Sequence, residues 1–461
     1  MNQIKVRTQR LIALLCCLCF LSASVHATDW YVGTSGTDAP GRGTSAATPF
    51  KTITYAIGSA APGDVIHVGS GLFTEQVVVN KNLTLVGQGT SLTTIAAPAT
   101  MTTTFIRDIL YTPVVLVTGA ANAVISNLTV DGNTFTNNSG DGYAGVAYLQ
   151  SGGSVNNVKL VSASNLNALS NQNGYAFLAY ADNGTAQNLT VSNSTIFSSQ
   201  KIAAGFFGNN ITATINQSTI KGAGKMEEFV QIGILMALGA TGTVQNNNIS
   251  DFLSSAFAGN GESALGIFVT GARSLVTIQD NELTDCQTAI RVESTTGSKI
   301  LRNKIVFQES TYDSDIAYSW AILVENGNYT VSQNEIDGGG KGTGIDAFSL
   351  ANETTILNAT YNIVKNVETG IAVEVDEEPG CATGEIHYNS ITGALEPLYN
   401  NQEPTAECPV PDDECNWLGS ANEEDFTNTD ETKPHIVGNV DYTPWLTNGT
   451  DQQPNVIGFQ P

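Results

Sequence analysis

Two short patterns of apolar and polar positions alternate along residues 233–391. In one, a small residue precedes alternating apolar positions; in the other, an apolar residue is followed by two variable residues, Asn, one more residue and an aliphatic residue. Alternation over three to five positions, punctuated by Gly and Asn, predicts short strands rather than helices. The first pattern starts at Gly233, Gly266, Ala289, Ala321, Gly344 and Gly370, and the second centres on Asn247, Asn281, Asn303, Asn334, Asn362 and Asn389.

The spacing of these asparagines predicts a solenoid. They recur every 22 to 34 residues, as expected for one coil per repeat with loops inserted at a corner. Strands this short cannot bury an apolar face alone, so successive coils must stack as parallel strands about 4.8 Å apart. Equivalent asparagines would then form a structural ladder of side-chain amides. We therefore predict an all-β fold, a right-handed parallel β-helix.

The same coil pattern continues towards the N-terminus, from Val114 to Ile220, with projecting loops over residues 131–145 and 161–174. The regular coils accordingly span residues 114–391. We expect one domain over residues 28–461, with an N-terminal cap and the first coils at 28–90 and a closing segment at 394–461. In that closing segment, Trp417 and Trp445 are expected to plug the open end of the solenoid.

A short amphipathic helix is expected in the cap. Pro49 marks its start, and the apolar residues that follow have helical spacing: Phe50, Ile53, Ala56 and Ile57. Such a helix would cover the first coil, whose exposed edge strand would otherwise template aggregation.

Segments at both ends of the chain carry a family resemblance. They are Trp30–Val32, Thr48–Ile53, Ala61–Asp64, Gly71–Glu75 and Leu83–Gly87, and, at the other end, Asn416–Gly419 and Gly438–Leu446. These segments resemble secreted bacterial proteins of the pectin-lyase-like superfamily. The resemblance implies a right-handed parallel β-helix with a short capping helix and inserted loops, and it identifies a fold rather than an activity.

Residues 1–27 have the features of a secretory signal peptide. Lys5, Arg7 and Arg10 precede an apolar run, and Val25-His26-Ala27 forms a small-residue cleavage site. The apolar run is too short to span a bilayer. We expect an exported protein, secreted, held at the cell surface or periplasmic, that does not span a membrane.

The net charge of −24 narrows the possible partners. It repels the phosphates of nucleic acids and anionic lipids, so neither is an expected partner. It is compatible with a soluble protein that meets neutral glycans, or acidic glycans through bound cations. A polysaccharide or a cell-surface glycan is the expected partner.

Four cysteines remain after the signal segment: Cys286, Cys381, Cys408 and Cys415. In an oxidising compartment the last three are close enough in sequence for a local disulfide. Cys408–Cys415 is the simplest pairing. A zinc site is disfavoured by the spacing.

Aligning the strands on their small residue places candidate chemistry on one outward face, because side chains alternate along a strand. The outward positions form two columns, and in the second Glu293 and Glu325 face each other about 4.8 Å apart. Such a pair needs a cation, a basic partner or a raised pKa. Arg291 lies two residues before Glu293 on the same strand. The first column is Leu235, Phe268, Arg291, Leu323, Asp346 and Ala372, and the second is Ala237, Thr270, Glu293, Glu325, Phe348 and Glu374.

Three functions are compatible with this face. The favoured one is a non-catalytic β-helix that binds polysaccharide or surface glycans. The second rests on a resemblance to β-helix polysaccharide lyases, which implies Arg291 as the catalytic residue and calcium held by Glu293, Glu325 and Asp346. The third is a glycoside hydrolase with a carboxylate pair. The candidate substrate-binding aromatic residues are Phe268, Tyr312, Tyr318, Trp320 and Phe348.

Overall fold

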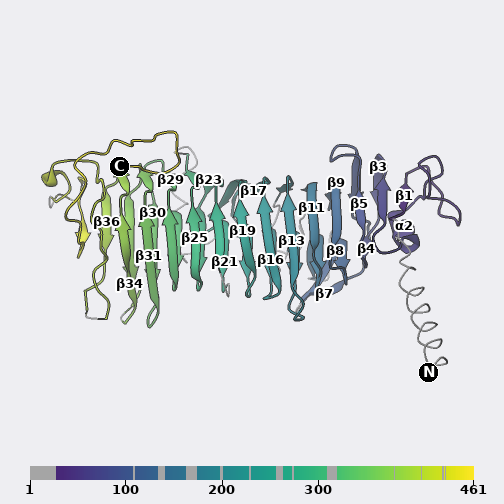
Figure 1. Ribbon diagram of the computed structural model, residues 1–461, viewed down its shortest axis with the longest axis horizontal. Coiled ribbons are helices and arrows are strands. Elements are labelled where there is room, and N and C mark those ends of the chain that lie inside the picture. The colour runs from purple at the N-terminus through teal and green to yellow at the C-terminus, as the bar shows by residue number, and fades with distance from the viewer. Residues whose placement is uncertain are drawn as a thin grey trace, which may run out of the picture.

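The protein is an elongated stack of coils with helix α2 (Ile53–Ser59) at the N-terminal end (Figure 1). The computed structural model describes residues 27–106, 109–132, 141–161, 174–197, 201–227, 230–255, 263–271, 275–308, 319–377, 379–405, 407–427, 430 and 432–461. Most of the expected signal segment, and the candidate residues Tyr312 and Tyr318, lie outside these ranges. No helix among the described residues is long and apolar enough to cross a membrane.

Within each complete coil the chain passes through three parallel rows of strands. We call them rows 1, 2 and 3 in the order in which they follow one another from β4 onwards. Row 1 is a separate sheet of 14 strands that includes β7 (Thr104–Ile106), the antiparallel partner of β8. Its other strands are β4 (Val77–Val79), β8 (Ile109–Thr118), β10 (Gly142–Leu149), β12 (Gly174–Tyr180), β15 (Ile202–Phe207), β18 (Ile232–Ala237), β21 (Leu265–Thr270), β24 (Thr288–Glu293), β27 (Trp320–Glu325), β30 (Thr343–Ser349), β33 (Thr369–Val375), β36 (Glu396–Asn400) and β37 (Val437–Gly438).

Rows 2 and 3 form one sheet of 23 strands, because the long strands β9 (Ala123–Asp131) and β11 (Gly153–Val161) belong to both rows. Row 2 also contains β1 (Asp29–Val32), β2 (Val65–Val68), β5 (Thr84–Val86), β13 (Gln187–Ser192), β16 (Ile211–Asn216), β19 (Thr241–Gln245), β22 (Val276–Gln279), β25 (Thr296–Leu301), β28 (Asn328–Ser332), β31 (Thr354–Thr360) and β34 (Cys381–His387). Row 3 also contains β3 (Gly71–Thr74), β6 (Thr93–Ala96), β14 (Thr195–Phe197), β17 (Thr219–Met226), β20 (Asn248–Ser254), β23 (Glu282–Cys286), β26 (Lys304–Val306), β29 (Glu335–Asp337), β32 (Ile363–Lys365) and β35 (Ser390–Thr392).

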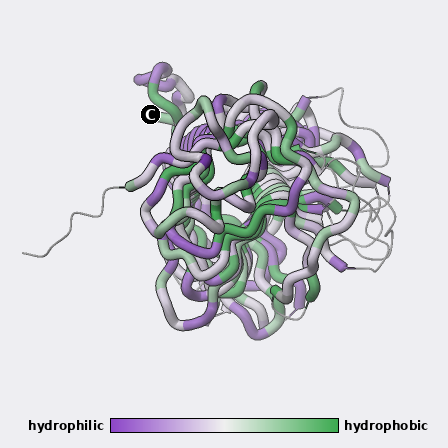
Figure 2. The backbone as a smooth tube through the Cα atoms, turned by 90° about the vertical axis from the view of Figure 1, so that its right-hand side faces the viewer, coloured by the Kyte–Doolittle hydropathy of each residue, from purple (hydrophilic) through white to green (hydrophobic). Residues whose placement is uncertain are grey.

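The core is a continuous apolar column of side chains inside the coils. Figure 2 shows the backbone of the coils end-on, coloured by the hydropathy of each residue. The inward positions predicted for row 1 are confirmed: Ile290, Val292, Ile322 and Val324 are fully buried. Stacking these short strands removes from water the apolar faces that a single coil would leave exposed.

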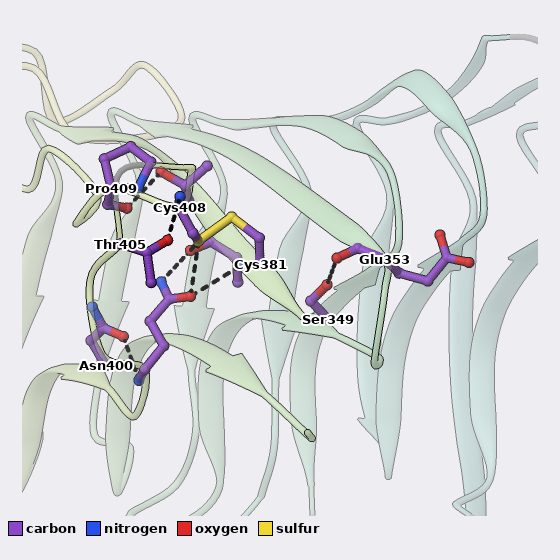
Figure 3. The surroundings of a disulfide bond; sticks show 10 residues. Ser349, Glu353, Cys381, Asn400, Thr405, Cys408 and Pro409 are labelled. Atoms are coloured by element: carbon purple, nitrogen blue, oxygen red, sulfur yellow. Dashed lines mark hydrogen bonds between the residues drawn. A yellow bond between two sulfur atoms is a disulfide. The ribbon is translucent and has the colours of Figure 1, made fainter. Parts of the chain in front are cut away.

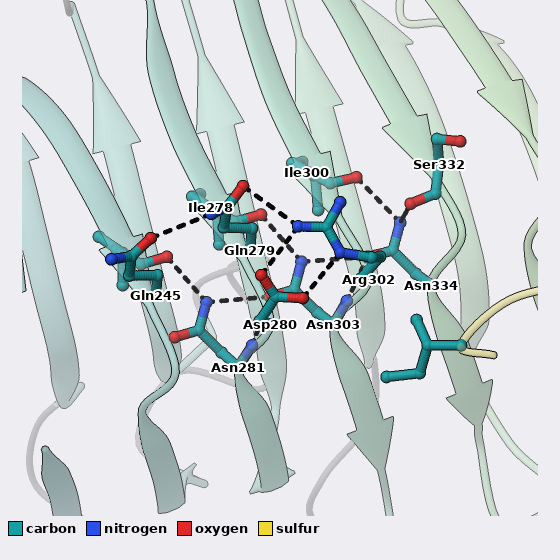
Figure 4. Close-up of polar contacts among 12 residues, drawn as sticks. Gln245, Ile278, Gln279, Asp280, Asn281, Ile300, Arg302, Asn303, Ser332 and Asn334 are labelled. Carbon is teal, nitrogen blue, oxygen red and sulfur yellow. Dashed lines mark hydrogen bonds and ion pairs between the residues drawn. The ribbon is translucent and has the colours of Figure 1, made fainter. Parts of the chain in front are cut away.

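The asparagine ladder is confirmed at the corner between rows 2 and 3 (Figure 4). Each Asn Nδ2 donates to the Oδ1 of the next Asn at 2.9–3.0 Å. The ladder has one more member than the sequence pattern indicated, Asn416, which accepts from Asn389. The residue before each Asn, such as Asn246 or Tyr361, has a positive φ, which turns the chain at this corner.

The capping helix is present but begins later than Pro49. Thr52 is its N-cap, accepting a hydrogen bond from the Tyr55 N–H at 3.2 Å. The Asp38 carboxylate in turn accepts hydrogen bonds from the backbone N–H and the hydroxyl of Thr52. Phe50 instead forms a bridge with Val32. The start at Pro49 was therefore wrong, because the capping side chain, and not the proline, sets the first turn.

The disulfide joins Cys381 to Cys408, and not Cys408 to Cys415 as the shortest separation suggested (Figure 3). The two cysteines are 27 residues apart, and their Cα atoms are 5.6 Å apart. This separation corresponds to one coil, so stacking brings them together, whereas Cys415 is a free thiol.

The C-terminal segment contains an aromatic cluster that packs against the core. Trp445 packs edge-on against Phe426 with ring centroids 5.6 Å apart, and Tyr442 contacts both rings. Phe426 is fully buried. Trp445 thus packs against the core, with Phe426 as an unpredicted centre of the cluster, and its role as a plug of the open end stays a prediction. Trp417 instead forms a bridge with Ser390 and so continues row 3.

Candidate functional site

The outward columns of row 1 have the register expected from the sequence. Arg291 pairs with Leu323 and Phe268, and Asp346 pairs with Leu323 and Ala372. In the second column, Glu293 lies opposite Glu325. The structure extends the first column towards the C-terminus, where Tyr399 lies opposite Ala372.

Arg291 bridges the two facing glutamates. Its Nε lies 2.6 Å from Glu325 Oε2, and its Nη2 lies 3.0 Å from Glu293 Oε2. The Phe268 ring lies 5.4 Å from the guanidinium carbon and supports it through a cation–π contact. A cation, a basic partner or a raised pKa was expected for the two facing glutamates, and Arg291 is the basic partner.

Glu325 also has the raised pKa that was expected as a third way to accommodate the facing glutamates. Its side chain is buried, with only 7% of the residue exposed. Burial raises the pKa of Glu325 above its usual value, Arg291 offsets part of that rise, and Glu293 adds to it.

Asp346 is the most secluded acid of the face, with 3% of the residue exposed. Trp320 Nε1 donates to its Oδ2 at 2.9 Å, whereas its buried Oδ1 has no hydrogen-bond partner within the part of the chain that the structure describes. Burial and the charge of Glu374 raise the pKa of Asp346 well above its usual value, against the lowering effect of the Trp320 hydrogen bond. Asp346 therefore keeps its proton to a higher pH than an exposed aspartate does.

Two further acids complete the group. Burial and the charge of Glu396 raise the pKa of Glu374. Glu396 Oε2 accepts a hydrogen bond from the Thr369 hydroxyl at 2.8 Å. Burial, Glu374, Glu396 and Asp346 together raise the pKa of Tyr399. We define the acidic face as Arg291, Glu293, Glu325, Asp346, Glu374 and Glu396 with the rings of Phe268, Trp320, Phe348 and Tyr399.

Sequence reasoning missed Glu396 and Tyr399. Their strand, β36, begins with Glu-Pro and lacks the small residue on which the others were aligned. The register Thr369–Glu396 nevertheless has the 27-residue separation of the neighbouring ladder step, Asn362 to Asn389. That spacing was the signal available in the sequence.

No group of three or more His, Cys, Asp or Glu side chains among the described residues is arranged to hold a metal ion. A positive charge was expected between Glu293 and Glu325, with calcium as one possible source. In the structure Arg291 supplies that charge. The roles assigned to Arg291, to the aromatic residues and to calcium remain predictions.

Residues 232–396 match a family model described as a right handed beta helix region. The fold is a right-handed parallel β-helix. No curated protein sequence matches this chain. Among solved structures it is similar to XylC in complex with xylose, at 12% identity over 89% of this chain and 82% of that chain, with a TM-score of 0.40.

Two other similar structures are a pectin methylesterase from carrot and the catalytic domain of a GH87 α-1,3-glucanase in complex with tetrasaccharides. The first is 12% identical, over 67% of this chain and 84% of that chain, with a TM-score of 0.37. The second is 11% identical, over 83% of this chain and 67% of that chain, with a TM-score of 0.47.

The outer face of this β-helix changes character along its length. Over β8 to β21 the outward side chains of row 1 join a second apolar cluster, separate from the core, that includes Tyr111, Tyr175, Leu178 and Leu235. From β24 onwards the same columns carry the acidic face.

Proposed function

We propose that this β-helix binds a polysaccharide along the acidic face. The observation that carries the proposal is the gathering of half-buried rings and carboxyl groups on adjacent strands β21, β24, β27, β30, β33 and β36. Aromatic rings bind the apolar faces of sugars, and carboxyl groups fix their hydroxyls through hydrogen bonds. Stacked coils repeat this arrangement along an axis, as a chain of sugars requires.

The charge of the face favours a neutral glycan. It carries five acidic side chains and one basic one, and Arg291 is already bonded to Glu293 and Glu325. A uronate would meet carboxylates rather than an available cation. The same ion pairs argue against lyase chemistry at Arg291, because a guanidinium held between two carboxylates stays protonated and cannot accept a proton from carbon.

Hydrolysis of the bound glycan is a second candidate, favoured by the raised pKa values of Asp346 and Glu374. A glycosidase needs one carboxyl group that keeps its proton near neutral pH to donate it to the leaving oxygen. Asp346 has the electrostatic environment for that role. Its seclusion requires that Trp320 or its surroundings move when substrate binds.

The binding proposal is tested by affinity electrophoresis and glycan arrays with the exported protein. We expect retention by at least one neutral polysaccharide and none by uronic-acid polymers, with calcium or with chelator. Phe348→Ala should weaken that retention at least tenfold, since it removes one sugar platform. The matched control is Phe197→Ala on β14, which removes a half-buried ring in row 3 and should leave retention unchanged.

The outcomes separate the candidates. Release of reducing sugar ends that is lost in Asp346→Asn, with binding kept, would establish the hydrolase. A calcium-dependent rise in ultraviolet absorbance on a uronate polymer, lost in Arg291→Ala, would replace the proposal with lyase chemistry. Equal binding by the Phe348 and Phe197 variants would place the glycan site elsewhere.

A further inference from the structure

We propose that removal of the signal segment completes the N-terminal cap, because the new α-ammonium of Thr28 forms an ion pair with the buried carboxylate of Asp64. The proposal rests on the expected cleavage after Ala27 and is independent of the function proposed for the acidic face. Its basis is the position of the Thr28 nitrogen.

Three N–H groups converge on Asp64, which is 3% exposed. The Thr28 nitrogen donates to Asp64 Oδ1 at 2.8 Å. The Trp30 indole Nε1 and the Ala61 backbone nitrogen both donate to Oδ2 at 2.8 Å. The carboxylate thus joins the first strand, β1, to the turn that precedes β2.

The position of Thr28 is set by more than this hydrogen bond. Its carbonyl oxygen accepts from the Val65 N–H at 3.0 Å, and the next residue, Asp29, pairs in register with Val65. Cleavage of the Ala27–Thr28 bond would therefore leave the Thr28 nitrogen in place. What changes is its chemistry, since hydrolysis converts an amide N–H into an ammonium with three donors and a full positive charge.

The environment of Asp64 favours that charge. Burial alone would raise the pKa of Asp64, but the hydrogen bonds from Thr28, Trp30 and Ala61, with the charge of Lys81, outweigh it and lower the pKa. An ionised, buried carboxylate that accepts a neutral N–H gains a stronger, charge-assisted bond when the donor becomes an ammonium. In the uncleaved chain no such charge can form at this position.

The ion pair predicts a pH dependence with a definite sign. Asp64 raises the pKa of the Thr28 amine above the value of about 7.7–8.0 usual for an α-amine. The stability it contributes is therefore present below that unfolded value and lost as pH rises through the higher folded value. An N-terminus displaced by one residue lacks this dependence.

The test compares two forms of the folded protein, one starting at Thr28 and one retaining Ala27. The rate at which an acylating reagent modifies the α-amine at pH 7 reports how much of it is deprotonated. We expect modification of the Thr28 form to be about tenfold slower, as for a pKa raised by one unit. We also expect it to unfold at a higher temperature than the Ala27 form.

Asp64→Asn in both forms keeps the comparison independent of folding defects. The variant should abolish the difference in labelling rate and in unfolding temperature between the two N-termini, whatever its own stability. N-terminal sequencing of the exported protein should give Thr28 first. Another first residue, or equal labelling of the two unsubstituted forms, would overturn the proposal.

Discussion

The asparagine ladder and the acidic face are both columns of polar side chains stacked on the same coils, yet they are opposite in character. The ladder is fully satisfied. Asn334, for example, accepts from the backbone N–H and the Nδ2 of Asn303, and donates to Ile300 and to Asn362. An amide is both donor and acceptor, so identical amides can bond one another indefinitely along a stack.

Carboxylates cannot form such a stack, because an ionised carboxylate only accepts hydrogen bonds. On the acidic face the acids therefore depend on other residue types: Glu293 and Glu325 share Arg291, Asp346 accepts from Trp320, and Glu396 accepts from Thr369. One oxygen of Asp346 has no hydrogen-bond partner among the described residues. The ladder is thus satisfied by its own repetition, whereas the acidic face depends on neighbours that differ from coil to coil.

The largest expected effect is in the ladder. Asn334→Ala would remove the acceptor of two Asn303 donors and the side-chain donor to the Ile300 carbonyl in a buried corner, and Asn362 Oδ1 would keep only the backbone N–H of residue 334. We expect a loss of about 3–5 kcal/mol in the free energy of unfolding. Urea unfolding measures the loss, and hydrogen exchange should show faster opening of β26, β29 and β32.

The control for this substitution is Asn358→Ala on β31, which truncates a half-buried asparagine on the outer surface of row 2. It should change the free energy of unfolding by less than about 0.5 kcal/mol. Similar losses for the two variants would mean that the ladder has no special role in stability.

How far the sequence predicts each column follows from this contrast. The repeat gave the ladder and both outward columns in correct register, because strand alternation and coil spacing are backbone properties. The same coil spacing could have predicted the disulfide, because Cys381 and Cys408 are 27 residues apart, as are Asn362 and Asn389. The prediction instead followed the shortest separation in sequence.

A basic partner for Glu293 and Glu325 was among the expected alternatives, but the bonding geometry of Arg291 and the burial of Asp346 were beyond sequence reasoning. They depend on side-chain conformation and on what covers each carboxyl group, and strand periodicity specifies neither. Two residues in one outward column, Arg291 and Asp346, thus have equivalent backbone positions and very different exposure.

An intermediate effect is expected at the bridging arginine. Arg291→Met would leave Glu325 buried opposite Glu293 with no cation, at a loss of about 1–3 kcal/mol at neutral pH. Because the removal of Arg291 raises the pKa of Glu325 further, the loss should shrink as pH falls and Glu325 becomes protonated. Urea midpoints at pH 5 and pH 8 measure both changes.

An exposed ion pair provides the matched comparison. Lys304 and Glu282 lie 3.5 Å apart with both side chains about half exposed, so Lys304→Met should change the midpoints little at either pH. If the two variants behaved alike, Arg291 would be an ordinary surface charge and the acidic face would have no electrostatic strain to relieve.

The smallest effect, and the one most specific to this face, is expected at Asp346. Its folded pKa is raised above the unfolded value, so its contribution to stability is present below the unfolded pKa and is lost as pH rises through the folded one. Asp346→Asn removes that loss while keeping an acceptor for Trp320. We expect the variant to equal the unsubstituted protein within about 1 kcal/mol at low pH and to be the more stable of the two at high pH.

Asp337, on the outer surface of row 3, provides a control of opposite sign. Burial would raise the pKa of Asp337, but hydrogen bonds from Asn366 and Gly339 and the charge of Lys365 lower it, so its contribution is present above the unfolded pKa and is lost on acidification. Asp337→Asn should therefore destabilise the protein at neutral pH and converge with it in acid. If the free energy of unfolding changed with pH in the same way for both variants, Asp346 would be ionised like any surface acid. The proposal that Asp346 donates a proton would then be wrong.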